Sequence, residues 1–159
     1  MFYIKKMTIM KQILDLDAKL SENFTLREFV RSQVAEKHHI DNTPSRPVII
    51  RLENLCRHVL QPLRDKFGPI YINSGYRCEE LNEKVRGVGN SQHLIGEAAD
   101  IRIVNTRQGL DYYDFICDNL EFDQLLFEYR KDGVKWLHVS CKWDIKKNRH
   151  MAIPNYQVK

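Results

Sequence analysis

The sequence lacks any apolar run of the ~20 residues that a helix needs to cross a bilayer. It also lacks the shorter apolar run of a secretory signal, because lysines interrupt the opening stretch MFYIKKMTIMKQIL. We therefore expect a protein that is made in the cytoplasm without a signal peptide and that has no membrane span.

Cysteine is sparse and widely spaced. The four cysteines are Cys56, Cys78, Cys117 and Cys141, and no two of them form a CxxC pair. This spacing excludes a cysteine zinc knuckle and a dithiol redox motif. Without a secretory signal, we expect free thiols rather than disulfides.

An excess of charge is also missing. The formal net charge is only +4, which is too small to indicate a nucleic-acid partner. One denser basic patch lies near the C-terminus, at Lys142, Lys146, Lys147, Arg149 and Lys159. No nucleic-acid-binding motif accompanies it, so we interpret residues 146–159 as a solvated, partly disordered tail and expect no nucleic-acid partner.

At 159 residues, the chain has the length of one domain. We place that domain at residues 20–145, between an N-terminal arm (1–19) and the basic C-terminal tail (146–159). Helical patterns come first, over about 24–38 and 47–67. Thr25 and Glu28 have the spacing of a capping box, and Pro62 should kink the second helix.

Strand patterns follow at about 69–74, 99–103, 123–129 and 135–142, with a helix for which Thr106 is the predicted N-terminal cap. The dipeptide Asp132-Gly133 between the last two strands predicts a hairpin. Helices first and strands later indicate an α+β fold, with helices packed on one small antiparallel sheet.

The stretch SQHLIGEAAD, residues 91–100, carries the strongest chemical signal. His93 and Asp100 are too far apart for one helical face, but a loop entering a strand can bring them together, with a bend at Gly96. His138 lies among apolar neighbours in WLHVS. Imidazole and carboxylate groups are good zinc ligands. The spacing alone leaves a loop histidine and a satisfied core histidine as alternatives.

This stretch matches the pattern S-x-H-x-x-G-x-A-x-D of the zinc D-alanyl-D-alanine carboxypeptidases, a family that includes VanX-type dipeptidases and phage endolysins. WLHVS resembles the family's second zinc histidine motif, and SGYR resembles its upstream arginine motif. The motif order over about 20–143 is similar to the small single-domain branch of phages and prophages. The resemblance implies zinc held by His93, Asp100 and His138.

The same resemblance implies that Arg77 of SGYR faces the active site, where a guanidinium can hold a carboxylate or carbonyl oxygen. Ser91 is predicted to bind substrate or orient the metal loop, with a turn-capping role as the alternative. The implied partner is a peptidoglycan peptide substrate, and nothing in the sequence indicates an oligomeric state.

The general base departs from the family pattern, because Lys135 stands where relatives carry an acid three residues before the second histidine. Lysine is a poor substitute for a carboxylate that accepts a proton. Our candidate is Glu128, and Glu97 is the second. A two-residue hairpin turn would turn Glu128 away from His138, whereas a one-residue bulge would place the two opposite each other.

We thus expect a zinc metallopeptidase of peptidoglycan stem peptides, possessing D-Ala-D-Ala carboxypeptidase or L-Ala-D-Glu-type endopeptidase activity and derived from a phage or prophage. It would act on the cell wall after release or export. The alternative is a non-catalytic, zinc-containing module that binds wall peptides or forms part of a phage.

Overall fold

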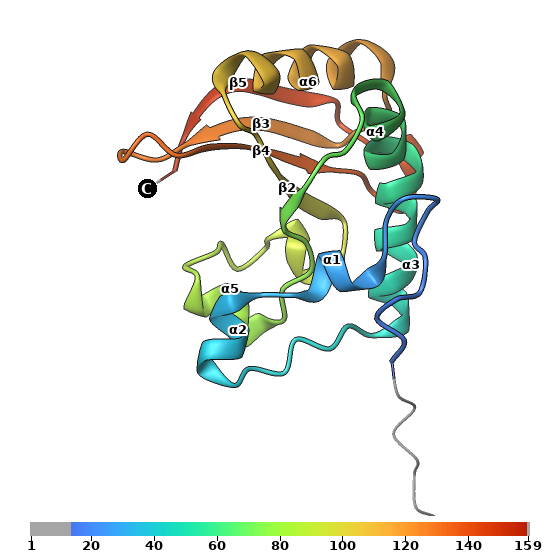
Figure 1. Ribbon diagram of the computed structural model, residues 1–159, viewed down its shortest axis with the longest axis vertical. Coiled ribbons are helices and arrows are strands. Elements are labelled where there is room, and N and C mark those ends of the chain that lie inside the picture. Colours follow the sequence, from blue (N-terminus) through green and yellow to red (C-terminus); the bar gives the residue numbers. More distant parts are fainter. Residues whose placement is uncertain (1–13, 159) are drawn as a thin grey trace, which may run out of the picture.

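A computed structural model describes residues 14–158 of the chain (Figure 1). Its centre is one five-stranded sheet in the order β1-β2-β4-β3-β5. The strands are β1 Ile72–Ser74, β2 Ala98–Arg102, β3 Gln124–Tyr129, β4 Lys135–Ser140 and β5 Met151–Gln157. The first four strands pair antiparallel, and β5 pairs parallel with β3 at the edge. The predicted α+β architecture is confirmed.

The first helical pattern forms two short helices instead of one. Helix α1 spans Leu26–Val30 and α2 spans Gln33–His38. The predicted capping box at Thr25 and Glu28 starts α1. The helix ends at Arg31, whose backbone is extended, and Ser32 starts α2 by accepting a hydrogen bond from the Ala35 amide. A serine side chain that competes for backbone amides explains the break.

The second helical pattern is one long helix with a defect at its centre. It comprises α3 Arg46–Leu55, a π-helical turn η1 Cys56–Leu60 and α4 Gln61–Phe67. The turn ends two residues before Pro62, which has no backbone N–H to continue the hydrogen-bond ladder. The hydrogen-bond ladder is disturbed before this proline in the form of a π-turn, and the predicted kink itself stays a prediction.

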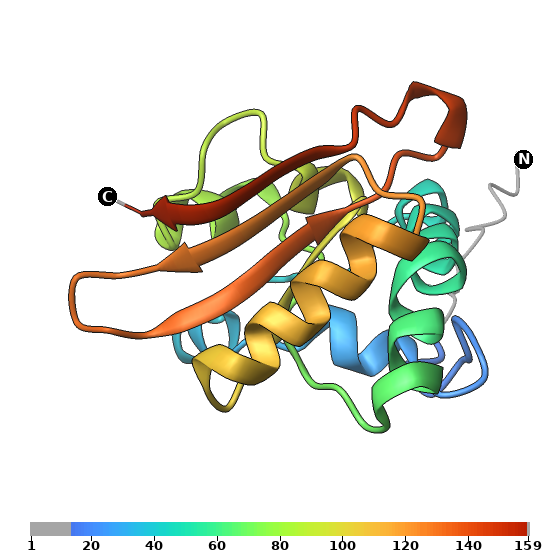
Figure 2. The ribbon, with the colours of Figure 1, turned by 90° about the horizontal axis from the view of Figure 1, so that it is seen from above.

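One face of the sheet is covered by helices and the other carries the polar groups. Helix α6, Thr106–Asn119, crosses the strands on the covered face (Figure 2). The cap of α6 is Asn105 rather than the predicted Thr106, because the Asn105 side chain accepts a hydrogen bond from the Gln108 amide. Apolar side chains on this face are buried with the helices in one core, among them Ile101, Leu125, Phe127, Leu137, Val139 and Ile116.

Three further short elements complete the described structure. They are the helix α5, Glu79–Lys84, and two short 3-10 turns, η2 Gln92–Ile95 and η3 Ile145–Lys147. Figure 1 places α1, α2 and α5 together on the side of the sheet away from α6. No helix in the described part of the chain is long and apolar enough to span a membrane.

The C-terminal segment differs from the expected loose tail. Residues Met151–Gln157 form β5, which extends the sheet beyond β3. The tail prediction was wrong here because the neighbouring basic residues hid a strand whose backbone pairs with the open edge of β3. At the other end, residues 1–13 of the expected arm lie outside the described residues. All four cysteines are free thiols, as predicted.

Candidate metal centre

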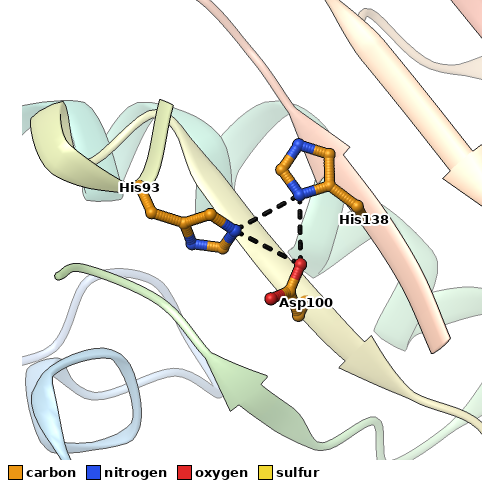
Figure 3. A group of neighbouring side chains, drawn as sticks. All are labelled: His93, Asp100 and His138. Carbon is orange, nitrogen blue, oxygen red and sulfur yellow. Dashed lines mark hydrogen bonds and ion pairs between the residues drawn. The ribbon is translucent and has the colours of Figure 1, made fainter. Parts of the chain in front are cut away.

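His93, Asp100 and His138 meet at one point on the polar face of the sheet (Figure 3). Nε2 of His93 lies 3.2 Å from Nδ1 of His138, and both nitrogens approach Oδ1 of Asp100, at 3.2 and 3.0 Å. Ligand atoms at the corners of a tetrahedron around zinc, at ~2.0–2.1 Å from the ion, lie about 3.3 Å apart. The triangle of donor atoms therefore has the dimensions of one face of a zinc tetrahedron.

Strand pairing and one loop bring these residues together. Asp100 on β2 lies directly opposite His138 on β4, which places their side chains side by side on one face. His93 comes from η2, just before β2. Gly96 ends η2 with a φ of +80°, and a Cβ there would lie 2.6 Å from the Val48 carbonyl oxygen. The bend expected at Gly96 is confirmed, and only glycine suits it.

The SGYR stretch orients the first histidine. Nδ1 of His93 lies 2.6 Å from the carbonyl oxygen of Gly75. A carbonyl only accepts hydrogen bonds, so the ring proton is on Nδ1 and the lone pair of Nε2 points toward Asp100. Such a partner fixes the tautomer of a metal-binding histidine. The Arg77 amide in turn donates to the His93 carbonyl, at 3.1 Å.

Gly75 can hold this position because it has no side chain. A Cβ at Gly75 would lie 2.7 Å from the Cα and carbonyl oxygen of Phe29 in α1. Next to it, the Tyr76 amide donates to that same carbonyl at 2.8 Å. The backbone of SGYR therefore lies directly between α1 and the metal centre.

Replacing Gly75 by alanine should separate these layers and move the carbonyl that holds His93. We expect Gly75→Ala to lower the free energy of unfolding by roughly 1–3 kcal/mol, as overpacking does, and to weaken zinc binding. Urea unfolding and a zinc-binding titration measure the two effects. Gly89→Ala is the matched control, because nothing lies within 4 Å of a Cβ at Gly89. Equal behaviour of the two variants would contradict this role of Gly75.

The electrostatics of the centre fit a cation. Burial lowers the pKa of His93, although Asp100 opposes the shift, so the ring is held neutral. A neutral imidazole has a lone pair on Nε2 that can bind a metal ion. Burial opposes ionisation of Asp100, but the neighbouring His93 and His138 outweigh it and hold its pKa below the usual value. The donor set is one that zinc accepts.

Arg77 lies beside this centre, as predicted. Its Nη2 is 4.0 Å from Oδ2 of Asp100. Among the described residues, no group accepts a hydrogen bond from its buried Nε. Both Arg77 and Asp100 line a pocket of about 710 Å³ bounded by β1, α2 and α5. A buried donor without a partner is costly, so Arg77 is suited to an oxygen that arrives in the pocket.

Glu128 lies on the same polar face of the sheet as His138. The register of β3 and β4 that places it there differs from both registers considered from the sequence. The loop joining β3 and β4 has three residues, 131–133. It is closed by a hydrogen bond that the Arg130 amide donates to the Val134 carbonyl. Leu126 thus lies opposite His138, and Glu128 lies opposite Trp136. Both registers considered from the sequence were wrong, because Gly133 with its φ of +87° allows the longer loop. Residues 126 and 128 nevertheless share the face of His138.

The environment of Glu128 is that of a proton acceptor rather than a surface carboxylate. Burial, with a further contribution from the negative charge of Asp100, raises the pKa of Glu128 to about 7. His138, Trp136 and Arg77 act in the opposite direction. A carboxyl group with a pKa near the working pH can both accept and return a proton.

The structure separates the other candidates from the centre. Lys135 is exposed, and its Nζ donates to the Thr106 hydroxyl on the α6 side at 3.0 Å. Side chains alternate between the two faces of a strand, and position 135 is three residues from His138 on the same strand. A side chain at position 135 therefore points to the face opposite the histidine. Glu97 accepts from the Trp143 amide at 3.0 Å and lies 3.7 Å from Nε of Arg51 on α3, which indicates a structural role.

Ser91 caps η2. Its hydroxyl accepts a hydrogen bond from the His93 amide, at 3.4 Å. This is the turn-capping role that the sequence left open, whereas contact with a substrate stays a prediction.

Sequence reasoning missed Asp123 and the Gly75 carbonyl. Asp123 is fully buried and accepts a hydrogen bond from Gln92, the neighbour of His93, at 2.9 Å. Its position in the segment FDQLLFE was a usable signal, since an aspartate just before a buried strand needs partners. No sequence signal marks a backbone carbonyl as a histidine partner.

Comparison with known proteins agrees with this geometry. No curated protein sequence matches the chain. A family model described as Peptidase M15 matches residues 22–140, which include SGYR, the three candidate metal ligands and Glu128. The match extends over most of the chain and over β1 to β4, and the chain belongs to the peptidase M15 family.

Proposed function

We propose that this protein is a zinc-dependent peptidase that cleaves peptidoglycan stem peptides. The observation that carries the proposal is the triangle of His93, Asp100 and His138, with Glu128 on the same face of the sheet. Membership of a peptidase family supports hydrolysis of a peptide bond. A zinc ion held by these three residues would supply a lowered water pKa and polarisation of the substrate carbonyl.

The chain's own residues supply the remaining steps. Arg77 donates from its guanidinium to an oxygen of the bound peptide and so orients the scissile bond. The Glu128 carboxylate accepts a proton from the attacking water and returns it to the nitrogen of the leaving amine. Gly75, through its carbonyl, keeps Nε2 of His93 unprotonated and in position.

The family and the pocket support this substrate class. Stem peptides carry carboxylates and carbonyl oxygens, and Arg77 can bind either. The proposed bond is D-Ala-D-Ala or of the L-Ala-D-Glu type, and the proposed origin is a phage or prophage. Action on the wall then requires release or export of the protein after its synthesis in the cytoplasm.

Zinc removal tests the proposal. Purified protein should release new amino groups from cell-wall fragments, lose this activity in a chelator, and regain it on addition of zinc. His93→Ala should not regain it. Full activity in the chelator would contradict a metallopeptidase. A protein that binds zinc and wall fragments but releases no amines would instead be a binding module.

A further inference from the structure

Asp123 joins the metal loop to the C-terminal segment. It lies directly before β3, and its side chain has no exposed surface. Nε2 of Gln92 donates to its Oδ2 at 2.9 Å. From the other side, Arg149 donates through Nε at 3.0 Å and Nη2 at 2.6 Å, and its backbone amide donates at 3.0 Å. Nζ of Lys142 is 3.4 Å away.

These contacts hold a buried charge that would be costly without partners. Burial opposes ionisation of Asp123, yet the hydrogen bonds from Arg149 and Gln92 lower its pKa to about 2. Arg149 contributes a two-pronged guanidinium contact, which is the strongest form of such pairing. Two of the five residues of the sequence-defined basic patch, Lys142 and Arg149, thus face a buried carboxylate instead of a free surface.

The Gln92 side chain can fix the position of His93, because both residues belong to the same short turn. Turn η2 has four residues, and His93 is the next residue after Gln92. The Asp123 backbone also bonds to β4 through Ser140 and to the start of β5 through Met151, at 2.7 and 3.0 Å. Asp123 therefore links η2 to a segment that lies beyond residue 140, where the family match ends.

We infer that Arg149, acting through Asp123 and Gln92, is a positioning residue that holds the metal loop in its binding geometry. The inference rests on the proposed zinc site, but its structural part does not need the metal. Mutating a residue that holds a metal ligand in place, without itself binding the metal, typically lowers metal affinity by roughly 10–100-fold. Because two intermediaries separate Arg149 from His93, we expect an effect at the lower end of that range.

The test compares Arg149→Gln and Gln92→Ala with Arg107→Gln, which removes an exposed ion pair on α6. In metal-free protein, both test variants should raise the hydrogen-exchange rates of amides 92–96 roughly tenfold. In competition with a chromophoric chelator, both should weaken zinc binding roughly five- to tenfold. The double variant should bind zinc no more weakly than the single variant with the lower zinc affinity, because the two residues act through one path. Arg107→Gln should stay within twofold of wild type.

Unchanged exchange and unchanged zinc affinity in both test variants, even with a lower melting temperature, would overturn the inference and leave Arg149 a purely structural role. If Arg149→Gln does not fold, Arg149→Lys takes its place, since it keeps the charge and loses the fork. If the wild type binds no zinc, the proposed function fails, while the exchange rates still decide the positioning role.

Discussion

Glu128→Gln should lower kcat/KM for a wall-peptide substrate by about 10²–10⁴-fold, the usual contribution of a general base. Glutamine has nearly the same shape but cannot accept the proton. The zinc content of the variant should stay at the wild-type level, because Glu128 is outside the triangle formed by His93, Asp100 and His138. Kinetics and metal analysis of the same preparation measure both quantities.

Stability supplies the control for folding. In the folded protein the pKa of Glu128 is raised from its ordinary value of 4.5 to about 7. The folded protein therefore loses stability as the pH rises from 4.5 through 7, because the unfolded chain releases this proton more readily. At pH 8 the metal-free Glu128→Gln protein should therefore be at least as stable as the metal-free wild type. An activity loss with intact zinc and undiminished stability assigns Glu128 to the chemistry.

Glu97→Gln is the matched carboxylate control. Glu97 contacts Arg51 and the Trp143 amide, so its variant should be less stable but should keep turnover near the wild-type level when folded. The opposite pattern, with activity lost in Glu97→Gln and kept in Glu128→Gln, would transfer the role of base to Glu97.

His138→Ala should remove most of the zinc affinity and all measurable hydrolysis. The change leaves two of three ligands, and we expect zinc binding to weaken by more than about 100-fold, beyond the loss that outer partners cause. The control is His58→Ala, which alters a half-buried histidine in η1, away from the centre. Equilibrium titration with a competing chelator measures the affinity. Wild-type affinity in His138→Ala would show that the metal lies elsewhere.

The sequence was most informative where one local pattern decided the outcome. The capping box at Thr25 and the bend at Gly96 depend on neighbouring residues, and each lies where it was predicted. The meeting of His93, Asp100 and His138 came from family resemblance, since spacing alone left other interpretations open. The structure brings the three together.

Long-range pairing could not be predicted in the same way. The face of Glu128 depends on one residue of hairpin register, and Asp132-Gly133 is compatible with loops of two or three residues. Strand β5 escaped notice because its partner, β3, is far away in the sequence and its flanking charges resemble a solvated tail. Lys135 was excluded as the base from the sequence, and the structure places its side chain away from the centre. The alternation of side chains along β4 places position 135 on the face opposite His138.

X-ray absorption at the zinc edge of the loaded protein tests the metal assignment most directly. With one zinc per chain, the spectrum should fit two imidazole nitrogens and one carboxylate oxygen at ~2.0–2.2 Å, with light-atom ligands alone. The same fit should lose one imidazole in His138→Ala. Zinc–sulfur distances of ~2.3 Å, which only a cysteine site would produce, or a spectrum unchanged in His138→Ala, would contradict the account.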